Sequence, residues 1–128
     1  MSHMVKMTMP KIKNEETLKR ACRNLGLVFD KTKKLATYYA GNKMKCDAVI
    51  SCPGSTYEIA LTQTQDGSYD MQMDSYCPTL TKKVGKSAGL LSQQYQIEEH
   101  KRIARAMGKE IMSCKTLPNG TIDLRIRA

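Results

Sequence analysis

The chain has 128 residues, of which 41% are hydrophobic and 26% charged, and its formal net charge is +9. That balance excludes a largely disordered protein and is sufficient for one hydrophobic core, so we expect a single domain over residues 1–128. No apolar run approaches the roughly 20 residues of a membrane-spanning helix, and the first residues lack the apolar stretch of a secretory signal. We therefore expect no membrane association and an intracellular, reducing location such as the cytoplasm.

The charge is distributed in three blocks. Residues 1–45 contain eleven Lys or Arg and three acids, residues 46–80 contain five acids and no Lys or Arg, and residues 81–128 contain ten bases and four acids. Such segregation gives a folded domain a polarised electric field, which affects its choice of partners more than its fold.

The first half of the chain predicts a strand, a helix and a run of further strands. A short β-compatible segment over residues 4–9 ends at Pro10, and Asn14 is placed to cap a helix that Gly26 ends. Short segments rich in Tyr, Val, Ile and Thr then follow, separated by turn residues, with Asp66 and Gly67 giving the clearest hairpin signal. These segments predict an antiparallel meander over residues 27–29, 35–40, 44–50, 56–62 and 69–73.

The second half predicts helices and then a hairpin. Residues 79–107 have helical periodicity with weak points at Gly85 and Gly89, which favours two helices, and Leu90, Tyr95, Ile103 and the other apolar residues form one broad apolar side. Residues 111–116 and 121–127 predict a closing hairpin. Because strands and helices occur in blocks, we expect an α+β fold with a mainly antiparallel sheet covered by helices on one face.

The five cysteines do not form a recognisable site. They are odd in number and irregularly spaced, which favours reduced thiols, and no pair has the close spacing of a zinc site. Cys22 is expected in the core, and Cys46, Cys52 and Cys114 are expected to be buried or half-buried. We predict no metal and no cofactor.

Two further motifs have ordinary structural explanations. Residues 82–87 end like a phosphate-binding loop, but Leu80 occupies the position where that loop needs its first glycine. His100 lies on the apolar side of a predicted helix, where a histidine at the edge of the core is the usual explanation, and His3 precedes the first strand. The sequence therefore assigns no catalytic residue.

The basic side chains are the remaining candidates for a binding site. Solvated surface charge is the ordinary explanation for them, but gathered on one surface they would bind phosphates or an acidic protein. The scarcity of aromatic residues argues against nucleic acid, although Tyr38 and Tyr39 lie between two of the basic groups. The candidate residues are Lys31, Lys33, Lys34, Lys43, Lys45, Lys82, Lys83, Lys86, Lys101, Arg102 and Arg105.

Several segments, taken in their order and spacing, match one known family: residues 1–3, Leu18, Ala21, Leu25, Gly26, Tyr39, Gly41, 46–50, 57–59, 66–67, 69–71, Asp74, 91–95 and 119–124. Through these segments the chain resembles the family of hypothetical chloroplast open reading frame thirty-five, a domain of unknown function with cyanobacterial, plastid, bacterial and viral members. The resemblance implies an α+β fold and an intracellular location, and it supplies no reaction and no catalytic residues. This chain departs from the family at Tyr76 and Cys77, where members usually have a Trp, and it is more basic.

We therefore expect a small non-enzymatic accessory or regulatory protein whose basic surface binds a nucleic acid or an acidic protein. One alternative is a metal-dependent or thiol-dependent enzyme built around His3, Asp47, Asp74 or the cysteines. Another is a viral protein that inhibits a host target, since the family that the chain resembles has viral members. The sequence does not indicate an oligomeric state.

Overall fold

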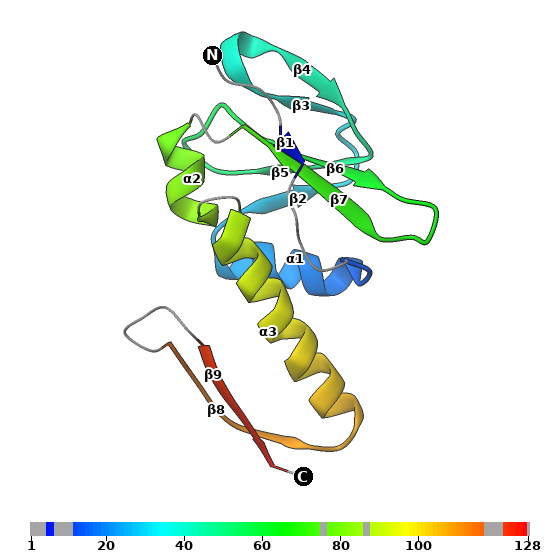
Figure 1. Ribbon diagram of the computed structural model, residues 1–128, viewed down its shortest axis with the longest axis vertical. Coiled ribbons are helices and arrows are strands. Elements are labelled where there is room, and N and C mark those ends of the chain that lie inside the picture. The colour runs from blue at the N-terminus through cyan, green and yellow to red at the C-terminus, as the bar shows by residue number, and fades with distance from the viewer. Residues whose placement is uncertain (1–4, 7–11, 75–76, 86–87, 117–121, 128) are drawn as a thin grey trace.

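The computed structural model describes residues 5–6, 12–74, 77–85, 88–116 and 122–127 (Figure 1). It has the expected α+β fold, and all of its strand pairs are antiparallel. The helices are α1 (Glu15–Asn24), α2 (Pro78–Val84) and α3 (Gly89–Ala106). The strands are β1 (Val5–Lys6), β2 (Val28–Asp30), β3 (Leu35–Thr37), β4 (Lys43–Lys45), β5 (Ala48–Ser51), β6 (Ile59–Gln63), β7 (Tyr69–Met73), β8 (Glu110–Thr116) and β9 (Ile122–Arg127).

Five strands form the central sheet in the order β1-β7-β6-β5-β2. The β5-β6-β7 meander is confirmed, and so is the hairpin at Asp66 and Gly67, where Gly67 has a φ of 86° that favours glycine. β1 pairs with β7 and accounts for the described part of the strand predicted over residues 4–9; the remainder lies outside the described residues.

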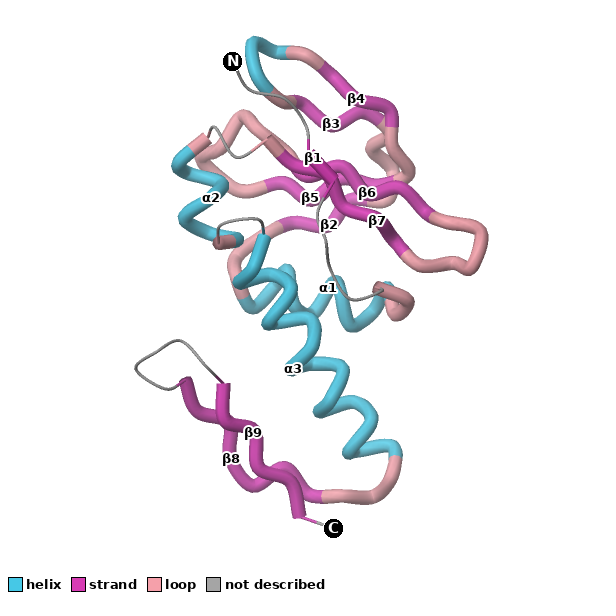
Figure 2. Tube along the Cα trace, in the orientation of Figure 1, coloured by secondary structure: helices cyan, strands magenta, loops and turns pink. Residues whose placement is uncertain are grey.

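The two faces of the sheet are covered by different elements. Ile50 and Leu61 point to the side of the helices and join the main core, whereas Val49 and Ala60 point to the opposite side. There they pack against Ala36 of the β3–β4 hairpin, residues 35–45, which we call the flap. The expectation that helices cover one face is therefore correct. The sequence did not predict that the flap covers the second face (Figure 2).

The predicted meander is wrong at the flap. Residues 44–50 form two strands instead of one, because the chain leaves the flap at β4 and enters the central sheet at β5. Asp47 fixes this change: its main-chain N–H donates to the oxygen of Leu61, and its carboxylate accepts from the N–H of Gln63 at 2.7 Å. The strands expected over residues 35–40 and 56–62 are also shorter, ending at Thr37 and beginning at Ile59.

Helix α1 has the boundaries that its capping residues predict. The side chain of Asn14 accepts from the N–H of Thr17 at 2.9 Å, and Gly26, with a φ of 74°, follows the C-cap residue Leu25. The hydroxyl of Tyr95 on α3 accepts from the N–H groups of Lys13 and Asn14, at 3.2 and 3.1 Å. Thus α3 holds the beginning of α1 in place.

Helices α2 and α3 are separate, as predicted. Gly85 ends α2 with a φ of 83°, and a Cβ at this position would lie 2.7 Å from the main-chain nitrogen of Leu90. At 18 residues, α3 is about 27 Å long. Its first half packs in the main core through Leu91 and Tyr95, and its second half extends beyond α1 toward the last hairpin (Figure 1).

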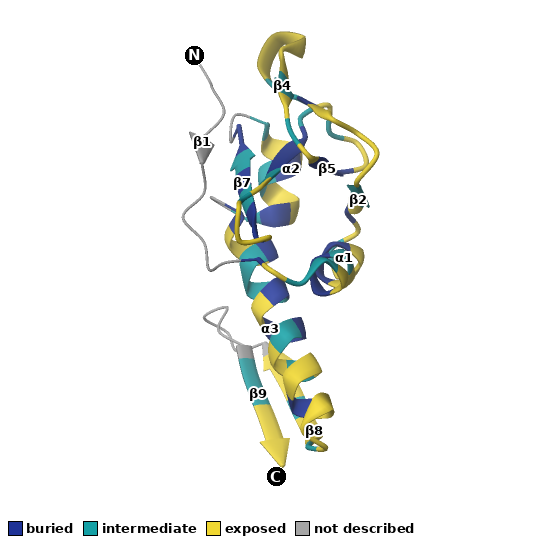
Figure 3. Cartoon of the chain, turned by 90° about the vertical axis from the view of Figure 1, so that its right-hand side faces the viewer, coloured by how far each residue is buried: buried dark blue, intermediate teal, exposed yellow. Residues whose placement is uncertain are grey.

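The β8–β9 hairpin forms a separate two-stranded sheet beside the second half of α3. Its register places Ile111 opposite Ile126 and Cys114 opposite Leu124, so these residues share one face, and the charged residues of β9 lie on the other. Figure 3 shows that this end of the molecule is mostly exposed, in contrast to the buried sheet. We call residues 97–116 and 122–127 the C-terminal lobe.

Candidate interaction surfaces

The lysines of the β2–β3 loop are occupied by internal contacts. The ammonium of Lys31 lies 3.0 Å from a carboxylate oxygen of Glu15, and this hydrogen bond holds the pKa of the carboxyl below its usual value. The ammonium of Lys34 donates to the main-chain oxygen of Asp47 at 2.8 Å. Both side chains are exposed, but their first contacts are within the protein.

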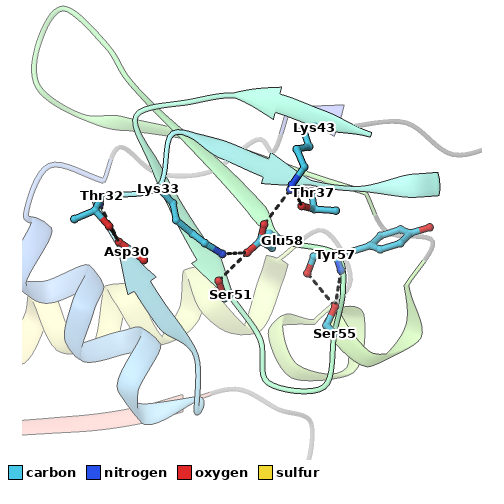
Figure 4. Close-up of polar contacts among 9 residues, drawn as sticks. All are labelled: Asp30, Thr32, Lys33, Thr37, Lys43, Ser51, Ser55, Tyr57 and Glu58. Carbon is cyan, nitrogen blue, oxygen red and sulfur yellow. Dashed lines mark hydrogen bonds and ion pairs between the residues drawn. The ribbon is translucent and has the colours of Figure 1, made fainter. Parts of the chain in front are cut away.

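Lys33 belongs to a polar network centred on Glu58, which is 8% exposed (Figure 4). The carboxylate accepts from Lys33 at 2.8 Å, from the hydroxyl of Ser51 at 3.0 Å and from the N–H of Thr37 at 3.0 Å. Burial raises the pKa of Glu58, but the three hydrogen bonds outweigh burial and leave that pKa below its usual value. The network joins the flap to the central sheet, so its role is structural.

The flap presents its remaining lysines to solvent. Lys43 and Lys45 are exposed on β4, whereas Met44 between them packs toward the sheet. Within the described residues neither lysine has an ion-pair partner. Tyr39 in the turn of the flap is 37% exposed. This outer face is therefore basic and includes an aromatic side chain.

The basic residues of α2 form a second group. Lys82 and Lys83 are exposed on the last turn, and the ammonium of Lys83 lies 3.9 Å from the place that a Cβ on Gly26 would occupy. Cations near the ends of α1 and α2 interact favourably with the helix dipole. Lys86, also a predicted binding residue, lies outside the described residues.

The third predicted group lies on the second half of α3, at the opposite end of the molecule from the flap (Figure 1). Lys101 pairs with Glu98 at 3.5 Å and Arg102 pairs with Glu99 at 2.8 Å, each across three residues of the helix. Arg105 is exposed and has no ion-pair partner among the described residues. The ten described candidates therefore form three separated groups, on the β2–β3 loop and flap, on α2, and on α3.

The C-terminal lobe contains more positive charge than its own acids neutralise. It has seven Lys or Arg and four acids, and each acid has one basic partner, since Arg125 pairs with Asp123 and Arg127 pairs with Glu110 in addition to the two pairs on α3. Three cations of the lobe remain without an acidic partner in the described part of the chain: Arg105, Lys109 and Lys115.

An open groove of about 260 Å³ lies between the end of α3 and β9. Three apolar side chains in its lining are unusually exposed: Ile103 by 44%, Met107 by 63% and Ile126 by 38%. The α3 residues of the lining recur at the spacing of one helical stripe, on the side of α3 that faces away from its core residues Leu91 and Tyr95. The complete lining is His100, Ile103, Ala104, Met107, Lys109 and Ile126.

The sequence prediction for the apolar side of α3 is wrong in part. The apolar residues were expected to form one broad side against the core, but Leu90, Ile103 and Met107 are exposed. His100 is exposed in the groove instead of lying at the edge of the main core. The one signal that could have revealed this second stripe is the width of the apolar pattern, which exceeds what one packed face of a helix requires.

The cysteines and acids considered for catalysis are dispersed. Cys22 and Cys52 are buried and Cys46 is half-buried, as expected, but Cys114 is exposed because the outer end of the lobe has no covering element among the described residues. Among those residues no three His, Cys, Asp or Glu side chains form a group that could hold a metal ion. Asp47 is engaged in the strand junction, Asp74 is buried, and His3 lies outside the described residues.

Comparisons with protein-family models, with curated proteins and with solved structures find no significant match. The family resemblance noted in the sequence stays a prediction. None of the described helices is both long enough and apolar enough to cross a membrane.

Proposed function

We propose that this protein acts as a non-enzymatic binding factor, and that its partner is an acidic protein bound at the groove of the C-terminal lobe. The observation that supports this function is the coincidence of exposed apolar side chains with positive charge that has no acidic partner among the described residues. Ile103, Met107 and Ile126 offer the apolar contact area, and Lys109 lies beside them in the same lining. Apolar centres with a charged rim are typical of protein interfaces, where charge steers association and selects the partner.

A nucleic acid fits this groove less well. Among the described residues its lining has one lysine, one histidine and three large aliphatic side chains, but no Phe, Tyr or Trp on which a base would stack. Phosphate backbones are bound by rows of Lys and Arg, and the candidates for such a row are divided among three parts of the surface.

The outer face of the flap is the second candidate, for single-stranded nucleic acid. Lys43 and Lys45 project from the same side of β4, and exposed Tyr39 lies in the adjoining turn. A basic face with an aromatic side chain is the arrangement that binds single strands without sequence preference. Binding at this face would weaken steeply with added salt.

Affinity capture from native cell lysate distinguishes the two functions. The unaltered protein is compared with Ile103→Ser/Lys109→Glu, which alters the groove, with Lys43→Glu/Lys45→Glu, which alters the flap, and with Val28→Ser, a control in which the replaced side chain is 52% exposed on β2. We expect one acidic protein to be captured by all except the groove variant. Capture that persists in the groove variant would contradict the proposed function, and nucleic acid lost only with the flap variant would favour the second candidate.

A further inference from the structure

The groove has the shape and surroundings of a site for one more helix. A two-stranded sheet is marginally stable unless its apolar face is covered, and α3 covers the face of the β8–β9 hairpin incompletely, since Ile126 remains 38% exposed while Leu124 is half-buried. The uncovered strand lies beside the exposed stripe of α3. A helix placed there would contact both.

The exposed stripe on α3 indicates that the segment bound in the groove is a helix and not a strand. A strand added to the free edge of β9 would be held by main-chain hydrogen bonds and would need no contact with α3. Residues 100, 103, 104 and 107 line the groove at helical spacing, and such rows are what a second helix packs against at an axis separation of about 8–10 Å. A helical occupant of the groove would explain why His100, Ile103 and Met107 are exposed.

The charges indicate the chemistry of that helix. The described lining contains Lys109 and His100 and no carboxylate, and the lobe has three cations without acidic partners among the described residues. A second copy of this chain bound through the same face would bring Lys109 near its own counterpart. Like charges in an interface are unfavourable, whereas an acidic segment would neutralise the lobe.

We infer that the groove between α3 and β9 binds an acidic amphipathic helix of a partner protein. Its apolar residues recur every three or four positions and contact Ile103, Met107 and Ile126, and its Asp or Glu residues lie on the flanks, near Lys109. The inference rests on the proposed function in that it requires the groove to be a partner site, and it adds the secondary structure and the charge of the bound segment.

Selection from an unbiased library of displayed peptides, about 16 residues long so that short helices can form, tests the inference without knowledge of the natural partner. The full-length protein is the bait. Enriched peptides are then measured against the unaltered protein, Ile103→Ser, Lys109→Glu and the control Val28→Ser, and the thermal unfolding of each variant shows that it is folded.

We expect the enriched peptides to have apolar residues at helical spacing and a net negative charge. Their affinity should fall at least about tenfold for Ile103→Ser and should also fall for Lys109→Glu. Their affinity for Val28→Ser should equal that for the unaltered protein. Enriched peptides with alternating apolar residues that depend on Ile103 would overturn the helix and leave the proposed function standing. Peptides that are basic would overturn the predicted charge. Peptides indifferent to both groove substitutions, or no enrichment, would overturn this inference, and the lysate capture would then decide the proposed function by itself.

Discussion

The ammonium of Lys33 lies 2.8 Å from a carboxylate oxygen of Glu58, which joins the loop before the flap to the residue that precedes β6. Glu58 has 10% of its side chain exposed and Lys33 has 49%. Glu58 is thus nearly enclosed, whereas the side chain of Lys33 is about half exposed. Replacing Glu58 and replacing Lys33 should therefore change the stability of the protein by different amounts.

Replacing Glu58 with Gln is expected to destabilise the protein by about 1–3 kcal/mol, because the hydroxyl of Ser51 and the N–H of Thr37 lose a charged acceptor in a buried position. Lys33→Met is the matched control and should have the smaller effect, since the side chain of Lys33 is half exposed to solvent. Urea unfolding of both variants measures the difference. An equal or larger loss in Lys33→Met would show that the ion pair, and not the buried acceptor, stabilises the flap.

The contribution of Glu58 is expected to disappear in acid. Its pKa in the folded protein is lower than the usual value of 4.5, so the stabilisation is fully present above 4.5 and is lost as the pH falls through the lower, folded value. The difference in unfolding free energy between the unaltered protein and Glu58→Gln should therefore shrink below pH 4.5. A difference that grows in acid would contradict the direction of this pKa shift.

Gly85→Ala is expected to destabilise the protein by about 1–3 kcal/mol. Gly85 has φ and ψ of 83° and 163°, a region that is almost exclusive to glycine, and a Cβ there would approach Leu90. Gly89→Ala provides the comparison, because a Cβ at Gly89 meets nothing within 4 Å. Alanine there reduces the conformational freedom of the unfolded chain, which should stabilise the folded protein by about 0.4–1 kcal/mol. The thermal unfolding temperatures of the two variants should shift in opposite directions; shifts in the same direction would mean that the backbone at Gly85 has another conformation.

The cysteines are expected to react with iodoacetamide in a defined order. Burial raises the pKa of the Cys22 thiol to about 12, so Cys22 should react only after unfolding. Burial also raises the pKa of Cys77, but hydrogen bonds with Ser55 and with N–H groups at the beginning of α2 outweigh it and leave that pKa lowered. Mass spectrometry should find Cys77 and the exposed Cys114 modified before Cys22 and Cys52. Early modification of Cys22 would show that the core opens under native conditions.

Much of the fold could be predicted because local chemistry determines it. Asn14 and Gly26 define α1, Gly67 defines the β6–β7 hairpin, and Gly85 separates α2 from α3, each through the conformation or hydrogen bond that the residue supplies. The flap could not be predicted, because residues 44–50 have a continuous strand-like pattern. The break at Cys46 and Asp47 depends on contacts with β6, which are distant in sequence.

For the candidate site, the sequence predicted the positive charge but not the position of the groove. The sequence indicated positive charge on the second half of α3, at Lys101, Arg102 and Arg105. It did not indicate that Ile103 and Met107 face away from the core, since an apolar residue on a helix has the same pattern whether it meets the core or a groove. The division of the lysines among three surfaces likewise depends on the folded chain.

The most direct test of the account is photo-crosslinking from single positions of the protein in its native cells. A photoreactive amino acid at Met107, which lines the groove, is compared with the same group at Val28, an exposed apolar position on β2. We predict one acidic protein joined to position 107, absent from position 28, and lost when Lys109 is replaced with Glu. The same protein joined equally at both positions, or only copies of this chain joined at position 107, would contradict the assignment of the groove as the partner site.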